Sequence, residues 1–362
     1  MNSFKIFAII CACTLVAACA SENTENDIAY TEHSVENVNV FLKVEENPFL
    51  GRPTAITVSS NGLYIVDSGR DMIHKVDRAG DLLMSFGSSG QGPGEYQSIA
   101  GFWPQENSYL LYDYNSFKFI TYDKQGDMID EVIMRENPVN PESQRSIPIT
   151  VEALTPNKLL IPTGGNKGSL FAIAELGSED VIFAGDALGE FVPGYNRDSV
   201  MQSYGDGEVP DNFKNLVMLG SSADAIYSLQ QTTGVLEKFN HSGERIWNMN
   251  LNIPGQSEVM DQIAQHNIDA VRNGEPTQLF IHAHAMDATD QGVAMLLRMP
   301  KNQPASVVWV PEDGSGVDLI TVESLDVSPR GFMGMFALSG EDQKAYYLER
   351  ETGTVFQFEW PL

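Results

Sequence analysis

The segment GLYIVDSGRDMIHKVDRAGDLL (residues 62–83) decides the fold, because the chain repeats it. Forty-six residues further on, SYLLYDYNSFKFITYDKQGDMI (residues 108–129) aligns with it without a gap, and Asp67 falls on Asp113. Self-similarity at a fixed period of this length is typical of a repeat architecture, in which each repeat is one supersecondary unit.

The pattern returns four more times along the chain. Two copies are clear, at residues 225–246 and 344–360, and two are degraded, near residues 158–176 and 293–314. Each unit alternates apolar and polar residues and is interrupted by turn residues such as Asp-Arg-Ala-Gly. With the short apolar stretch that precedes it, each unit makes four strands, named A to D from the centre outwards. The sequence therefore predicts an all-β fold, a six-bladed β-propeller of four-stranded blades.

The N-terminal part of the propeller supplies a strand that the last unit lacks. The last unit reaches Leu362 after only three strands, while NVNVFLKVEE (residues 37–46) precedes the first unit without a partner. We expect this segment to pair as the outer strand of the last blade, because this pairing closes the ring and removes its open edges. The predicted propeller domain therefore covers residues 37–362.

The residues before the propeller predict export and a lipid anchor. Residues 1–18 contain an apolar run (residues 6–16) that is too short to span a bilayer, which indicates a secretory signal peptide. The following Val-Ala-Ala-Cys resembles the bacterial lipobox, whose cysteine is acylated and becomes the first residue. We therefore expect lipidation at Cys19 and an acidic tether over residues 19–36. The alternative is an ordinary cleaved signal with a chance cysteine.

Composition limits the partners and the chemistry. All three cysteines lie at or before position 19, so the mature domain has none for a disulfide, a thiolate metal site or a nucleophile. The net charge of −27 argues against nucleic acid, and it leaves the lipid anchor as the only attachment to a membrane. No phosphate-loop, nucleophile-elbow or metalloprotease motif is present, and no cofactor is expected.

The first repeat also carries a family resemblance. Residues 51–96, GRPTAITVSSNGLYIVDSGRDMIHKVDRAGDLLMSFGSSGQGPGEY, resemble the NHL-type propeller repeat. They are still more similar to the six-bladed β-propeller lipoproteins of Gram-negative bacteria, whose first blade ends in a Gly-x-Gly-Pro-Gly-Glu-aromatic loop, here residues 90–96. The resemblance implies the cell envelope as location, on the outer membrane and facing either the periplasm or the exterior. It implies no activity, because that family is largely without an assigned one.

The glycine-rich loop that ends this stretch is interpreted as a connection between blades. It lacks the Lys-Ser/Thr of a phosphate loop, and Pro93 removes a backbone donor. We expect Gly90, Gly92 and Gly94 to adopt positive φ angles at the crossing from the first blade to the second.

Propeller topology places these crossings and the B–C turns on one face, here called the top face. Two long insertions, residues 187–215 and 255–278, fall on it, and insertions of this length rarely lack a function. The second contains a predicted helix near residues 258–272, with Ser257 as its N-cap and Gly274 at its C-terminal end. Its apolar stripe either packs on the propeller or lets the helix cover the channel.

Four residues are candidates for ligand binding near the channel mouth. His282 and His284 stand two apart at the start of an inner strand, a spacing that is found in metal sites, although two ligands do not make one. Arg52 and Arg70 would make the mouth cationic, which suits a carboxylate, a phosphate or an acidic glycan.

Three functions remain open at this point. The favoured hypothesis is a binding module that takes a protein partner or a small envelope ligand on its top face. The alternatives are a hydrolase or lyase with its site around His282 and His284, and an architectural subunit of an envelope complex. The fold alone does not separate them, because propellers serve all three roles.

Overall fold

The computed structural model describes most of the chain from Tyr30 onwards. The described residues are 30–60, 62–134, 137–139, 150–189, 191, 197–206, 208–253, 255–275, 277–299, 303–326 and 334–362. The predicted signal peptide, Cys19 and the first part of the tether lie outside them. Among the helices of this part of the chain, none combines the length and the apolar character that a bilayer crossing requires.

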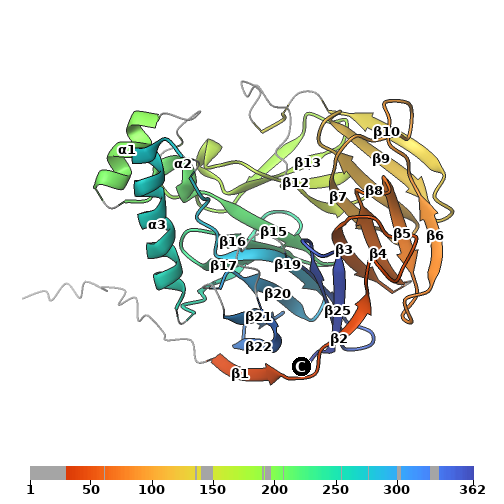
Figure 1. The fold of residues 1–362 in the computed structure, drawn as a ribbon. Coiled ribbons are helices and arrows are strands. Elements are labelled where there is room, and N and C mark those ends of the chain that lie inside the picture. Colours follow the sequence, from red (N-terminus) through yellow and green to blue (C-terminus); the bar gives the residue numbers. More distant parts are fainter. Residues whose placement is uncertain are drawn as a thin grey trace, which may run out of the picture.

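Six sheets form a closed ring, which confirms the predicted six-bladed β-propeller (Figure 1). Each blade has four antiparallel strands. The first three blades consist of β3 (Pro53–Ser59), β4 (Gly62–Asp67), β5 (Met72–Val76) and β6 (Leu82–Phe86); β7 (Ile99–Pro104), β8 (Ser108–Asp113), β9 (Lys118–Asp123) and β10 (Met128–Ile133); and β11 (Glu152–Thr155), β12 (Lys158–Pro162), β13 (Phe171–Glu175) and β14 (Val181–Ala184).

The remaining three blades follow the same order from the centre outwards. They consist of β15 (Val217–Ser221), β16 (Ile226–Gln230), β17 (Val235–Phe239) and β18 (Arg245–Asn250); β19 (Ala283–Thr289), β20 (Gly292–Leu297), β21 (Pro304–Pro311) and β22 (Val317–Asp326); and β23 (Gly334–Ser339), β24 (Lys344–Glu349), β25 (Thr354–Glu359) and β2 (Asn39–Leu42).

The burial of the strands explains why the repeat is visible in the sequence. The second strand of a blade lies between two neighbouring blades, so every residue of β4 and of β20 is buried. The outer strands face solvent on one side, and β18 therefore alternates exposed with half-buried residues. Aromatic side chains fill the spaces between blades, as where Tyr64 and Tyr109 bring their hydroxyl oxygens within 3.2 Å of each other between blades 1 and 2. These packed interfaces hold the ring together.

Closure of the ring follows the prediction in one strand and departs from it in another. Strand β2 pairs antiparallel with β25 as the outer strand of the last blade, as expected. The predicted tether, however, is too long, because Tyr30–Val35 forms β1 and pairs in parallel with β22 as a fifth strand of blade 5. The pairing uses backbone hydrogen bonds and two side-chain contacts, which a polar sequence supplies without an apolar face. His33 Nε2 lies 2.9 Å from Asp318 Oδ1, and Ser34 Oγ donates to Glu323 Oε1 at 3.3 Å.

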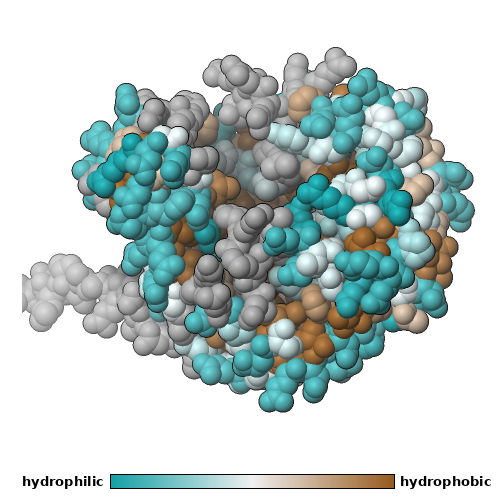
Figure 2. All heavy atoms as spheres, viewed as in Figure 1, coloured by the Kyte–Doolittle hydropathy of each residue, from teal (hydrophilic) through white to brown (hydrophobic). Residues whose placement is uncertain are grey.

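Both long insertions lie on the top face and pack against each other. The first contains α1 (Arg197–Gly205) and α2 (Asp211–Lys214), and the second contains α3 (Gln256–Asn273). Figure 1 shows all three helices together on one side of the ring, and a short 3-10 turn, η1 (Asn166–Gly168), lies in blade 3. In Figure 2 the outward surface of this helical lobe is mainly hydrophilic, with brown residues on the side turned toward the propeller.

Helix α3 confirms the predicted element but corrects its details. Its N-cap is Gly255, with no side-chain cap, while Gly274 ends it as predicted, with φ of 74°. Asn267 lies at the centre of the buried face, where its Nδ2 donates to the Tyr204 hydroxyl of α1 (3.0 Å). The apolar cluster around it is built from the two insertions, so the stripe packs on the first insertion and not on the blades.

The glycine-rich loop is a connection between blades, and its glycines are needed for a reason that the sequence did not suggest. Of the three glycines expected to have positive φ, only Gly94 has it, at 72°. Gly90 and Gly92 instead leave room for Glu95, whose Oε2 would lie 2.0 Å from a Cβ at position 90. The Glu95 carboxylate accepts the Gly92 N–H at 2.8 Å, so the loop folds around its own acidic side chain.

Candidate functional site

The central channel contains two connected cavities of about 520 Å³ each. The upper cavity opens on the top face, and the lower one lies between the inner strands. Both are lined by Arg350, Met335, Met218 and Leu219, which therefore mark their junction. A volume of this size is in the range of cavities that hold small molecules.

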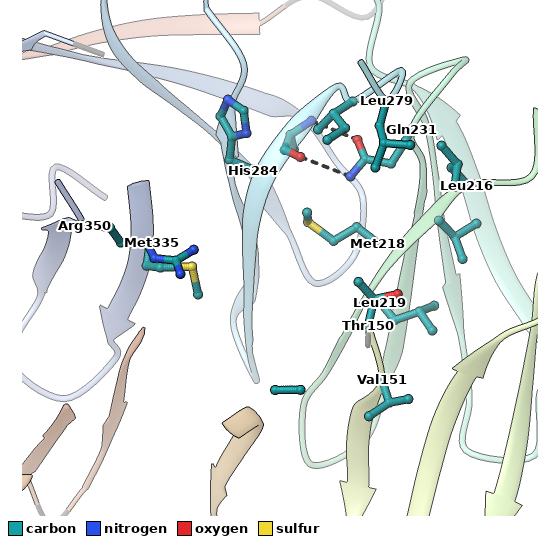
Figure 3. A pocket seen from close by; sticks show the side chains of 14 residues that line it. Thr150, Val151, Leu216, Met218, Leu219, Gln231, Leu279, His284, Met335 and Arg350 are labelled. Carbon is teal, nitrogen blue, oxygen red and sulfur yellow. Dashed lines mark hydrogen bonds between the residues drawn. The ribbon is translucent and has the colours of Figure 1, made fainter. Parts of the chain in front are cut away.

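Apolar side chains form most of the wall of the upper cavity. Figure 3 shows Arg350 and Met335 on one side and Leu216, Met218 and Leu219 on the other. Leu279 directly follows the second insertion and lines the upper cavity, so the segment after α3 contributes to its wall.

Arg350 is the cationic residue in the lining of both channel cavities. It lies in the B–C turn between β24 and β25, and it also lines a third cavity, of about 380 Å³, together with Arg52. Burial, and secondarily the Arg52 charge, lower the pKa of Arg350. Its Nε is buried, and within the described part of the chain it has no hydrogen-bond partner. Arg52 is exposed at the edge of the same third cavity.

The two candidate histidines do not converge. His282 is 6 % exposed and packs against the turn of blade 4, where its Cε1 lies 2.9 Å from the place a Cβ would take on Gly234. His284 instead lines the upper cavity. A bulge at this point in β19 breaks the alternation on which the shared face was predicted. Burial lowers the pKa of each ring to about 4, so both are neutral at pH 7.

A glutamine fixes the strand on which these histidines lie. Gln231 Oε1 accepts the backbone N–H groups of His282 (2.6 Å) and Ala283 (3.0 Å), and its Nε2 donates to Ala283 O (3.1 Å). These bonds hold the start of β19 against blade 4 and form part of the cavity wall (Figure 3).

The fourth candidate, Arg70, has a structural contact. Its Nη2 donates to Pro48 O at 2.8 Å, which ties the B–C turn of blade 1 to the segment before β3. Asp67 of the same turn accepts the backbone N–H groups of Gly51 and Arg52, at 2.5 and 2.6 Å. Although burial alone raises it, the pKa of Asp67 falls to about 2 because of His74 and these backbone donors. Asp113 binds the equivalent N–H groups of blade 2.

The lower cavity contains a carboxyl group that the sequence did not single out, that of Glu152 at the start of β11. The Trp103 indole Nε1–H donates to its Oε2 at 3.0 Å, and Ser221 Oγ lies 3.2 Å from its Oε1. The Trp103 ring is fixed over Gly101, where a Cβ would lie 2.0 Å from it. Burial raises the pKa of Glu152 to about 8, against the opposing effect of its two hydrogen bonds.

A second carboxyl group, that of Asp287 in β19, lines the same cavity. Its Oδ2 accepts the backbone N–H of Leu338 in the neighbouring inner strand at 2.5 Å. Burial raises the pKa of Asp287 to about 6, against the effect of this bond, and its charge contributes to the raised pKa of Glu152. The channel therefore contains two acids whose pKa values are raised by burial.

Metal binding finds no support in this arrangement. In the part of the chain that the structure covers, no three His, Cys, Asp or Glu side chains gather closely enough to hold an ion. His282 and His284, the weak candidates of the sequence, face different surroundings.

The fold defines the class of the protein, a six-bladed β-propeller. The family model DUF5128, described as a 6-bladed beta-propeller, matches residues 33–135, which span the closing strand and the first two blades. No curated protein sequence matches the chain.

Solved structures share the fold at low sequence identity. A putative exported protein from Bacteroides fragilis is 12 % identical with a TM-score of 0.54, over 91 % of this chain and 99 % of the other. A member of the duf4221 family from Bacteroides vulgatus is 11 % identical with a TM-score of 0.51, over 92 % and 98 %. Virginiamycin B lyase from Staphylococcus aureus is 10 % identical over 90 % and 89 %, and its TM-score of 0.43 is too low to bear on the chemistry of this chain.

Proposed function

We propose that this chain is a lipid-anchored envelope binding protein that takes a small organic anion with an apolar body into the mouth of its central channel. The observation that carries this proposal is Arg350, a half-buried cation that lines all three cavities and whose Nε lacks a hydrogen-bond partner among the described residues. Keeping such a group away from water is unfavourable unless a partner supplies the opposite charge.

The apolar wall of the upper cavity sets the second requirement. Met218, Leu219 and Leu279 offer dispersion contacts and few polar groups, so they favour a hydrocarbon or aromatic body over a sugar. Because the whole chain carries a charge of −27, its long-range field opposes polyanions, and a single carboxylate suits Arg350 better than a multiply charged group.

The described surface favours a small ligand over a protein partner. Nearly all the exposed large apolar side chains lie on β2 or on the outer strands of blades 1 to 4. Within the described residues, only Leu188 of this group lies on a top-face insertion, and Leu279 directly follows the other insertion. A protein interface at the channel mouth would need a larger apolar centre.

Titration calorimetry tests the anion site directly. The probes are octanoate, decanoate and 3-phenylpropanoate, each with its uncharged primary amide. We expect the carboxylates to bind the protein at least about tenfold more tightly than the amides, and Arg350→Met to remove this difference. The matched control is Arg272→Met, since Arg272 is exposed on α3. Equal affinity of the wild type and Arg350→Met for the carboxylates would contradict the proposal.

The lipid anchor is a separate part of the proposal and has its own test. Its support is the signal-like residues 1–18 and the lipobox-like context of Cys19. Expression in a Gram-negative host with a labelled fatty acid should label the wild-type chain and place it in the membrane fraction. Cys19→Ser should abolish the label. A labelled Cys19→Ser chain, or an unlabelled wild type, would refute the anchor and leave the anion site untouched.

A further inference from the structure

We infer that the ligand is zwitterionic, with its anionic group on Arg350 and an ammonium group on Glu152 and Asp287 deeper in the same cavity. The chemical class is that of an apolar amino acid or short peptide. This inference rests on the proposed function, whose anion site provides one end of the ligand.

Charge is distributed along the lower cavity in a way that matches such a ligand. Arg350, Glu152 and Asp287 are the ionisable groups of its described lining, and the rest is apolar, aromatic or hydroxylic. The three thus face one space of about 520 Å³. One cation and two acids in a common cavity complement a molecule with one anionic and one cationic end.

The two ends of the cavity are separated along the channel. Arg350 stands on a B–C turn at the top face. Inner strands begin at this face and run away from it, and Asp287 is the fifth residue of β19. The head of Glu152 is held by Trp103, the fifth residue of β7, and by Ser221, the last of β15. The acids therefore lie below the arginine in a cavity that Met218 and Met335 also line.

An ammonium group suits these acids better than a metal ion does. A calcium site requires six to eight oxygen ligands. Here, Trp103 and Ser221 already contact the two oxygens of Glu152, and the Leu338 N–H occupies one oxygen of Asp287. An ammonium has three donors and needs only the remaining lone pairs. The Trp103 ring, which also lines this cavity, adds an aromatic face that attracts a cation.

The protonation of the two acids predicts a measurable release of a proton when the ligand binds. Burial raises the pKa of Glu152 to about 8 and that of Asp287 to about 6, so Glu152 is mainly protonated in the folded chain at neutral pH. An ammonium nearby favours the carboxylate and expels the proton. The other ionisable groups that line the two cavities are Arg350, which keeps its proton, and His284, which is neutral. Binding of an ammonium at neutral pH therefore releases a proton from Glu152.

Calorimetry with matched dipeptides tests this. The probes are leucyl-leucine, leucyl-phenylalanine and phenylalanyl-leucine, together with their N-acetyl and C-amide forms, in phosphate and in Tris at pH 7. We expect the free dipeptides to bind at least about tenfold more tightly than the N-acetyl forms, with release of a proton. Glu152→Gln keeps the shape and should remove both effects. Glu258→Gln on the exposed face of α3 is the matched control and should retain both.

The outcomes separate this inference from the proposed function. If N-acetyl and free dipeptides bind equally, ammonium recognition is refuted, while the comparison of octanoate with Arg350→Met still decides the anion site. If Glu152→Gln retains the preference for free dipeptides and the proton release, Glu152 does not bind the ammonium group and only joins neighbouring strands. If no dipeptide binds the folded wild type, the substrate class is wrong. Should Glu152→Gln fail to fold, Asp287→Asn replaces it and should weaken free dipeptides more than N-acetyl forms.

Discussion

The indole of Trp103 donates a 3.0 Å hydrogen bond to Oε2 of Glu152, which joins blade 2 to an acid of blade 3. On the other side, Ser221 of blade 4 lies 3.2 Å from Oε1 and 2.9 Å from Ala153 O. The single Ser221 proton serves one acceptor at a time, and the carbonyl can only accept. When Ser221 donates to Ala153 O, it does not donate to Glu152, and the carboxyl group then loses one of the two hydrogen bonds that lower its pKa. The geometry thus matches the raised pKa of Glu152.

The first prediction concerns the pH dependence of stability. The pKa of Glu152 is about 8 in the folded chain, above its ordinary value of 4.5, so the folded state binds this proton more tightly. The resulting stability is complete below pH 4.5 and is lost as the pH rises through 8. Asp287 also lowers the free energy of unfolding as the pH rises, but only up to about pH 6. The neutral histidines raise the free energy of unfolding as the pH rises, but only below about pH 6.5.

The window from pH 6.5 to 8 therefore isolates Glu152. Urea denaturation there should show the free energy of unfolding of the wild type falling by up to about 1.4 kcal/mol per pH unit. Glu152→Gln should flatten this slope, whereas Glu258→Gln should preserve it. A wild-type free energy that is constant or rises across the window would show that Glu152 is ionised in the folded protein.

The second prediction concerns the buried cation beneath the glycine-rich loop. Lys118 is 6 % exposed, and its Nζ lies 2.9 Å from Gly92 O and 3.1 Å from Glu131 Oε2. Lys118→Met keeps the aliphatic stem and leaves these acceptors without their donor. We expect a loss of about 3 kcal/mol in the free energy of unfolding, measured by urea denaturation. The exposed pair of Lys43 is the control, and Lys43→Met should cost less than about 1 kcal/mol. Similar costs for the two variants would mean that Lys118 does not hold the loop.

The fold could be predicted from the sequence because the same strand pattern occurs in every blade. Each buried second strand appears in the sequence as an apolar run between turn residues. Six copies of this pattern along one chain are compatible with few architectures. Strand β1 could not be predicted in this way. The segment YTEHSV has no apolar face, and its position is decided by the free edge of β22, which is far away in the sequence.

The candidate site could be predicted only in outline. The top face and its insertions follow from topology, and Arg52 was placed near the mouth. Glu152 and Asp287, by contrast, are single acids within short inner strands, and no local pattern separates them from exposed acids. Arg350 stands in an ordinary turn. Their significance comes from sharing a cavity, which is a property of the closed ring.

The third prediction concerns the packing of His282. Gly234 has φ of 72°, and a Cβ there would lie 2.9 Å from the His282 ring. Gly234→Ala therefore adds a steric clash to backbone strain of about 1–3 kcal/mol. Gly177 is the matched control, because its φ is 76° and nothing lies within 4 Å of the equivalent position. Urea denaturation should show that Gly234→Ala costs clearly more than Gly177→Ala. Equal costs would mean that the His282 ring moves freely away from the turn.

The last prediction concerns the two N-terminal strands. Strand β1 buries only Val35 well and extends a blade that is already complete, whereas β2 supplies Leu42, which is 3 % exposed, to the core between the last and first blades. A chain that begins at residue 37 should therefore unfold cooperatively at a midpoint only a few degrees below that of a chain that begins at residue 20. A chain that begins at residue 44 should lose cooperative unfolding, because β25 becomes an open edge at the point where the ring closes. Near-ultraviolet circular dichroism during heating measures both. If the shorter chain retained a sharp transition at the same temperature, closure by β2 would not be what holds the ring together.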